Sequence, residues 1–141
     1  MTVRTAEAEW RGDIKQGSGS LKVGSGAFAG AYSFGSRFEN APGTNPEELI
    51  GAAHAGCFSM ALSLILGKAG YTPAQINTLA KVTIDIDTLS ITSIALTTVA
   101  SVPGIDEATF QKCANDAKEN CPVSKALAGT KISLQAQLLP S

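Results

Sequence analysis

Residues 44–62 read TNPEELIGAAHAGCFSMAL, and this stretch decides the fold that we expect. Asn45 is a strong N-cap residue, and Pro46 suits the first position of a helix. Glu48 stands three residues after Asn45, which is the spacing of a capping box. The apolar residues that follow predict a helix over residues 46–68.

The predicted helix is apolar on almost every side. Residues 49–66 carry no formal charge, and these 18 residues meet the lower limit for a membrane-spanning helix. The stretch nevertheless contains His54, glycines and serines, and it follows directly on two glutamates. Gly70, just beyond the helix, is a typical C-terminal stop. We therefore expect a central helix buried on nearly all sides, and no membrane span.

Length and composition fit one globular domain covering residues 1–141. Of the 141 residues, 44% are hydrophobic and 16% charged, which suffices to bury a core. The net charge of −1 argues against a nucleic-acid binder, which needs a basic face. Three cysteines are too few for a disulfide framework, and the first ten residues lack an apolar signal segment. We expect a cytoplasmic protein.

Short alternating stretches surround the helix and predict strands. Val82, Ile84 and Ile86 alternate with polar residues, which is typical of a half-buried strand. The predicted order is βββ-α-ββ-αα-β, an α+β fold with antiparallel strands around the central helix. The other expected elements are strands over residues 6–10, 20–23, 31–34, 91–102 and 132–138, a helix that Asp106 caps and residues 120–122 break, and a short helix over residues 123–128.

Two of the three cysteines are candidates for reactive thiols. Cys57 lies in the middle of the predicted helix, where simple packing is the alternative. Cys121 precedes Pro122 at a helix N-terminus, where unpaired N–H groups favour a thiolate, and core packing is again the alternative. Cys113 falls on an apolar helix face with Phe110 and is expected to pack. Cys57 and Cys121 can form a reactive pair. Cys113 can take the place of Cys121 only if its helix is rotated so that the opposite face points to Cys57.

Arg37, Glu47 and His54 are the other candidate residues. Arg37 is either a solvated side chain or a guanidinium that a carboxylate holds and that stabilises a thiolate. Glu47 lies ten residues before Cys57, about 15 Å along one helix, so the two can meet only across an interface or through a partner helix. His54 and the cysteines supply zinc-type ligand atoms, but their spacing is not that of a zinc finger or ribbon. We expect His54 to be a core or subunit-contact residue.

Residues 44–62, together with NCPVS at residues 120–124, resemble the family of osmotically inducible protein C and organic hydroperoxide resistance proteins. The similarity covers nearly the whole chain, including WRGD at residues 10–13 and VPGID at residues 102–106. It implies an intertwined homodimer with two active sites at the interface. An arginine ten residues before the glutamate, as Arg37 is, is the pattern of the osmotically inducible branch.

The resemblance implies a thiol-dependent peroxidase that acts in oxidative and osmotic stress defence. By position in the motifs, Cys57 matches the peroxidatic cysteine, Cys121 the resolving cysteine, and Arg37 and Glu47 the residues that assist them, reaching Cys57 from the other subunit. The implied cycle reduces an organic hydroperoxide, and hydrogen peroxide more weakly, through a Cys57 sulfenic acid and a Cys57–Cys121 disulfide. An external thiol then reduces the disulfide. No metal, flavin or haem is implied.

Two other functions remain open on the residues alone. One is a dimeric module that binds a small lipophile, with inert cysteines; Cys121 before Pro122 argues against it. The other is a zinc protein that uses His54 and the cysteines. If the peroxidase interpretation holds, apolar neighbours of the reactive cysteine such as Phe58 and Met60 favour an alkyl hydroperoxide as substrate.

Overall fold

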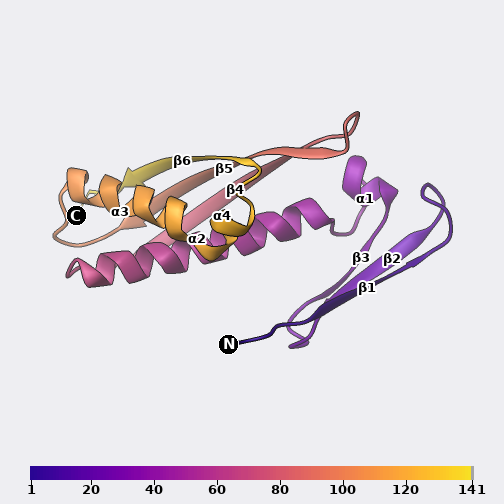
Figure 1. Ribbon diagram of the computed structural model, residues 1–141, viewed down its shortest axis with the longest axis horizontal. Coiled ribbons are helices and arrows are strands. Elements are labelled where there is room, and N and C mark those ends of the chain that lie inside the picture. The colour runs from indigo at the N-terminus through magenta and orange to yellow at the C-terminus, as the bar shows by residue number, and fades with distance from the viewer. Residues whose placement is uncertain (141) are drawn as a thin grey trace. The chain divides into compact units, whose positions relative to one another are not determined.

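The computed structural model describes residues 1–140, and Figure 1 traces two small sheets and one long helix. The contacts divide the chain into two compact units, Met1–Leu49 and Ile50–Ser141, each with its own three-stranded sheet. This is the α+β class that the sequence predicts, while the single-domain organisation stays a prediction. In chain order the elements are β1 (Ala6–Arg11), β2 (Ser18–Val23), β3 (Ala29–Tyr32), α1 (Phe34–Phe38), α2 (Pro46–Lys68), β4 (Gln75–Asp85), β5 (Ser90–Ser101), α3 (Glu107–Asn120), α4 (Pro122–Ala126) and β6 (Lys131–Leu138).

The first unit is the predicted antiparallel meander, in which β1 pairs with β2 and β2 with β3. Gly19 on β2 lies between Trp10 and Tyr32 in the register of the sheet. A side chain at Gly19 would collide with the Tyr32 ring. The glycine therefore lets the two aromatic rings pack together, with their centroids 5.4 Å apart.

The short helix α1 follows β3 and was not predicted; the strand was expected to continue to residue 34. Ser36 N–H donates to Ser33 Oγ at 3.1 Å, and Ser33 N–H donates to Ser36 Oγ at 2.8 Å. This reciprocal capping box turns the chain out of the strand at Ser33. With five residues and a glycine at Gly35, α1 has no apolar period from which to predict it.

The long helix α2 has the ends that the sequence predicts. Asn45 Oδ1 accepts a hydrogen bond from Glu48 N–H at 2.8 Å, which makes Asn45 the N-cap. The Glu48 carboxylate accepts from the Thr44 hydroxyl at 2.6 Å, so it serves a different donor from the one that the predicted capping box requires. At the other end, Gly70 adopts φ +94° and closes the helix with the hydrogen bonds of a Schellman motif.

The second sheet has the strand order β4-β5-β6, and one of its pairings corrects the prediction. β4 and β5 are antiparallel, but β5 and β6 are parallel. Helices α3 and α4 form the crossover that parallel strands need, and alternating side chains do not distinguish the two directions. A smaller correction concerns Ile86, which lies in the turn after β4 and is 51% exposed rather than half-buried in a strand.

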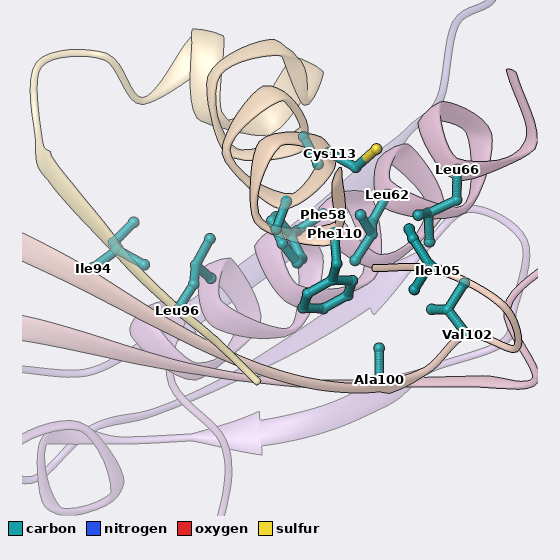
Figure 2. Packing of buried hydrophobic residues seen from close by; sticks show 12 residues of the cluster. Phe58, Leu62, Leu66, Ile94, Leu96, Ala100, Val102, Ile105, Phe110 and Cys113 are labelled. Carbon is teal, nitrogen blue, oxygen red and sulfur yellow. The ribbon is translucent and has the colours of Figure 1, made fainter. Parts of the chain in front are cut away.

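The core of the second unit lies between α2, α3 and one face of the sheet (Figure 2). Buried residues recur at every third or fourth position of α2 and at alternate positions of β5, the periods of a helix and of a strand. Asp106 caps α3, as predicted. The buried cluster consists of Phe58, Leu62, Leu66, Ile94, Leu96, Ala100, Val102, Ile105, Phe110, Cys113, Ala114 and Ala117.

The opposite face of α2 is exposed in the single chain. Met60 is 78% and Leu64 60% exposed, and Ala53 and Gly56 are exposed on the same side. By length and composition α2 is able to cross a membrane: its most apolar 18-residue window has a mean hydropathy of 1.8 and is 28% buried. The single chain therefore leaves one face of α2 uncovered. The expected burial of this helix on nearly all sides depends on the expected second copy and stays a prediction.

Candidate active site

Two cysteines meet in the second unit although 64 residues separate them. Cys57 lies on α2, and Cys121 is the residue that joins α3 to α4. Their Sγ atoms lie 2.8 Å apart, and both thiols are free. Cys121 is fully buried and Cys57 partly exposed, so solvent reaches the pair from the side of Cys57. The structure thus brings together the two cysteines that the sequence favours as a reactive pair.

The end of α3 and the start of α4 fix the position of the Cys121 sulfur. Cys121 N–H donates to Ala117 O at 3.0 Å, and this closes α3. The same residue is the N-cap of α4, with Pro122 at the first helical position and Sγ accepting a hydrogen bond from Ser124 N–H at 3.5 Å. A helix start with proline at its first position therefore holds the thiol, as the sequence predicts.

The two thiols differ in their preference for the proton. Burial raises the pKa of Cys57, and the contact with Cys121 raises it further, against a hydrogen bond from the Val123 N–H. Burial also acts to raise the pKa of Cys121, but hydrogen bonds from Cys57, Ser124 and Val123 outweigh it and lower the pKa. The two pKa shifts have opposite directions, so within this chain the surroundings favour the thiolate at Cys121 more than at Cys57.

His54 and Ser124 form a second buried contact beside the cysteines, and sequence reasoning missed the role of Ser124. His54 is fully buried one turn before Cys57 on α2, and its Nε2 lies 2.7 Å from Ser124 Oγ on α4. Burial lowers the pKa of His54, so the ring is neutral. The contact joins α2 to α4. The only sequence signal for it was the place of Ser124 in the NCPVS motif.

Arg37 and Glu47 form a two-pronged ion pair in the first unit. Arg37 Nε donates to Glu47 Oε1 and Arg37 Nη2 to Glu47 Oε2, each at 2.9 Å. Glu47 is 6% exposed, whereas the Arg37 side chain is 36% exposed. Such a fork fixes the plane of the guanidinium and leaves its free edge for another anion. The pair lies in Met1–Leu49, and the two cysteines lie in the other unit.

Hydrogen bonds between α1 and the start of α2 hold this ion pair in place. Ser36 Oγ donates to Thr44 O at 2.7 Å, and Asn45 Nδ2 donates to Ser36 O at 3.1 Å. Ser36 and Thr44 are both buried. The two residues that carry the charges are therefore set on short, cross-linked segments, although α1 itself has only five residues.

An apolar depression of about 240 Å³ lies beside Arg37 in the same unit. Its walls are mostly aromatic, and the Arg37 guanidinium lies 5.2 Å from the Phe38 ring centroid. Phe58, which we expected near the reactive cysteine as an apolar neighbour of a substrate, is fully buried in the core and is not available. The depression is lined by Trp10, Ile14, Tyr32, Ser33, Phe34, Arg37 and Phe38.

Cys113 lies in the hydrophobic core and is not part of the contact between Cys57 and Cys121. It is 6% exposed within the core cluster, and burial raises its pKa. Across residues 1–140 the structure gathers no group of three or more His, Cys, Asp or Glu side chains that could hold a metal ion. His54 and the three cysteines, the ligands of the zinc alternative, do not converge.

Two contacting thiols, one of them at a helix start, are a candidate dithiol redox centre. The profile of OsmC-like proteins matches residues 38–135. The chain is also 51% identical to the protein named peroxiredoxin OsmC from Escherichia coli strain K12, over 98% of this chain and 99% of that one. The chain therefore belongs to the OsmC family, as its sequence motifs predict.

Solved structures share the fold. The OsmC-like protein of Mycoplasma pneumoniae superimposes with a TM-score of 0.76 at 15% identity, covering 99% of both chains. The organic hydroperoxide resistance protein OhrB of Bacillus subtilis does so with a TM-score of 0.64 at 25% identity, covering 96% of this chain and 98% of that one. The prediction of an OsmC-like fold is confirmed.

Proposed function

We propose that this protein reduces organic hydroperoxides with Cys57 as the peroxidatic and Cys121 as the resolving cysteine. The chain is an enzyme of the peroxidase type: it belongs to the OsmC family and shares 51% identity with a relative named a peroxiredoxin. The resemblance to OhrB, named for organic hydroperoxide resistance, supports an organic substrate. A cytoplasmic location and a role in oxidative and osmotic stress defence belong to the same proposal.

The contact between the two sulfur atoms is the observation that carries this proposal. The Cys57 sulfur attacks the distal oxygen of the hydroperoxide, the O–O bond breaks, and the alcohol leaves with a proton. This oxidises Cys57 to a sulfenic acid. Cys121, 2.8 Å away in the reduced protein, then displaces water from that sulfenic acid and forms a disulfide. An external thiol returns the pair to two thiols by exchange.

Arg37 and Glu47 are proposed to stabilise the Cys57 thiolate. Burial raises the pKa of Cys57, and the charges of the second unit do not offset this burial. A peroxidatic cysteine needs a nearby cation, which lowers its pKa and favours the thiolate. The half-exposed guanidinium of Arg37, fixed by Glu47, is suited to that task, and in the proposed dimer it comes from the second copy.

The aromatic depression beside Arg37 supports the preference for organic hydroperoxides. Its indole and phenyl rings offer apolar surface to an alkyl or aryl group. The guanidinium at its edge attracts the oxygen atoms that develop negative charge as the O–O bond breaks. Hydrogen peroxide has no apolar group with which to use this surface, and so we propose that it reacts more slowly.

A homodimer is proposed because α2 exposes an apolar face that a second copy covers. Met60 and Leu64 together with the small residues Ala53 and Gly56 make up this face. At Gly56 nothing lies within 4 Å of the position that a Cβ would occupy, which leaves room for another helix to approach closely. Soluble monomers seldom leave a contiguous apolar patch of this kind uncovered.

Light scattering should find a species of twice the 14.5 kDa chain mass at micromolar concentration. Met60→Lys places a charge in the middle of the exposed face and should shift the protein toward monomers or aggregates. Lys81→Ala is the matched control: this residue is exposed on β4, outside that face, and should leave the mass unchanged. A wild-type mass of 14.5 kDa at that concentration would contradict the proposed dimer.

Cys121→Ser tests the proposed cycle directly. The variant should still consume one equivalent of hydroperoxide at Cys57, but repeated turnover with a dithiol reductant should collapse, because no disulfide can form within the chain. Cys113→Ser is the matched control and should keep activity close to that of the wild type, since Cys113 packs in the core.

Thiol titration of the wild type completes the experiment. One equivalent of organic hydroperoxide should remove two thiols per chain. If no thiols are lost, the cysteines are inert toward the hydroperoxide, as the lipophile-binding alternative requires, and the proposed cycle is wrong. If Cys121→Ser turns over as fast as the wild type, Cys121 is not the resolving residue.

A further inference from the structure

The buried contact between His54 and Ser124 is not used by the cycle described above. His54 is fully buried on α2, and its Nε2 lies 2.7 Å from Ser124 Oγ on α4, 70 residues away. The other ring nitrogen, Nδ1, is buried and has no hydrogen-bond partner among residues 1–140. A leucine of similar volume would fill this space without leaving a polar atom unpaired, so packing alone does not explain a histidine here.

The unpaired Nδ1 identifies the tautomer of the ring. A proton on Nδ1 would leave a buried N–H without an acceptor, which is rarer in proteins than an unpaired acceptor. The proton therefore lies on Nε2, and Nε2–H donates to Ser124 Oγ. Because Oγ accepts that bond, the hydroxyl proton of Ser124 is free to point elsewhere.

The Ser124 hydroxyl has Cys121 as its next partner. Ser124 is the third residue of α4, and its backbone N–H already donates to Cys121 Sγ at 3.5 Å. The side chain and the backbone of Ser124 both act to lower the pKa of Cys121. Ser124 thus links His54, through its hydroxyl, to Cys121, through its backbone N–H, and the Cys121 sulfur is the one in contact with Cys57.

We propose that His54 is a positioning residue for the resolving step: through the Ser124 hydroxyl it aims and activates Cys121 as the nucleophile that attacks Cys57 sulfenic acid. This inference rests on the proposed peroxidase function and adds to it the residues that control its second step. The substrate-oxidation step takes place at Cys57 and does not involve this chain of hydrogen bonds.

In the proposed step the Cys121 sulfur attacks the Cys57 sulfur, the S–S bond forms, and the S–O bond of the sulfenic acid breaks. The hydroxide that leaves takes the Cys121 thiol proton and departs as water. Cys121 is oxidised and Cys57 reduced by one formal unit each, so no further reagent is needed. The Ser124 hydroxyl stabilises the charge on the Cys121 sulfur as its proton leaves, and His54 keeps that hydroxyl aimed.

The test follows the two steps separately in a Cys113→Ser background, which leaves only the reactive pair. Five proteins are each mixed with one equivalent of cumene hydroperoxide. They are the Cys113→Ser protein with no further change and the same protein carrying Ser124→Ala, Ser124→Thr, His54→Leu or His54→Gln. Samples are quenched over time with dimedone, which traps sulfenic acid, and with iodoacetamide, which traps free thiols. Intact mass then gives the amounts of thiol, sulfenic acid and disulfide at each time.

Ser124→Ala and His54→Leu should form the sulfenic acid within about twofold of the wild-type rate but convert it to disulfide about tenfold more slowly, the effect of losing one hydrogen bond to a charged group. Ser124→Thr keeps a hydroxyl, and His54→Gln keeps an N–H near the position of Nε2. Both should restore the fast second step. A residue that only supports the fold would not slow one step alone and regain it through a retained donor.

Disulfide formation at the wild-type rate in Ser124→Ala would overturn the inference and leave the peroxidase function intact. Equal slowing of both steps, or no recovery in the threonine and glutamine variants, would also overturn it, because the contact would then be structural. If His54→Leu does not fold, the pair Ser124→Ala and Ser124→Thr decides the question. A wild-type pair that forms neither sulfenic acid nor disulfide would overturn the proposed function itself, and this inference with it.

Discussion

Cys57→Ser should lower kcat/KM for an organic hydroperoxide by about 10³-fold or more, as the loss of a catalytic nucleophile does. A serine hydroxyl cannot be oxidised to the equivalent of a sulfenic acid, so the first step of the cycle is lost. The measurement is hydroperoxide consumption in the presence of a dithiol reductant. Serine is close to cysteine in size, and Cys57 is only partly buried, so the variant should fold.

Cys113→Ser is the control for Cys57→Ser, because it replaces another cysteine of the same unit whose burial is greater. It should lose stability at most, and little activity. Retained turnover in Cys57→Ser would refute the assignment of Cys57. A large loss in a folded Cys113→Ser would show that the reactive pair has been assigned to the wrong cysteines.

Arg37→Ala should lower the rate of Cys57 oxidation by about 10²-fold, the usual cost of removing one group that stabilises developing charge. Arg37→Lys should fall between Arg37→Ala and the wild type. A lysine keeps the positive charge but cannot hold both oxygens of Glu47 and present a free edge at the same time. The measurement is the single-turnover rate of sulfenic acid formation.

The same substitutions should move the pH dependence of Cys57 alkylation. Without the cation the thiolate loses stabilisation, so the pKa rises and alkylation shifts to higher pH by about one unit or more. The experiment uses a background that lacks Cys113 and Cys121, so that one thiol is observed. Arg11→Ala is the matched control. Arg11 also pairs with a glutamate at 2.8 Å, but its side chain is exposed at the end of β1. Superimposable profiles for the wild type and both Arg37 variants would mean that another group stabilises the thiolate.

The parts of the fold that could be predicted are those with a local chemical signal. Asn45 and Gly70 mark the ends of α2, and Asp106 marks the start of α3, because each satisfies backbone groups that any helix leaves unpaired. Helix α1 escaped prediction because its signal is two serines, Ser33 and Ser36, around five residues without an apolar period. The parallel direction of β6 escaped because alternation along a strand is the same in both directions.

The candidate site also contains residues that the sequence could predict and a contact that it could not. The residues alone made Cys57 and Cys121 candidates for a reactive pair and made Arg37 and Glu47 candidate charged residues. The resemblance to a family was needed to assign each of them a role in one site. The contact between His54 and Ser124 could not be predicted, because it joins residues 70 positions apart that carry no charge and follow no spacing rule. A wholly buried hydrogen bond of this kind depends on how α4 packs on α2, and sequence periodicity does not specify that packing.

In the proposed dimer, the uncovered face of α2 makes the stability of this protein depend on its own abundance. If folding is completed by pairing, the law of mass action applies to it, and each tenfold rise in chain concentration adds about 1.4 kcal/mol to the stability of the pair. Chains made in small numbers would leave Met60 and Leu64 open to proteases and to other apolar surfaces. Chains made in a burst would protect one another, so the rate of synthesis would set the lifetime of the protein as well as its amount.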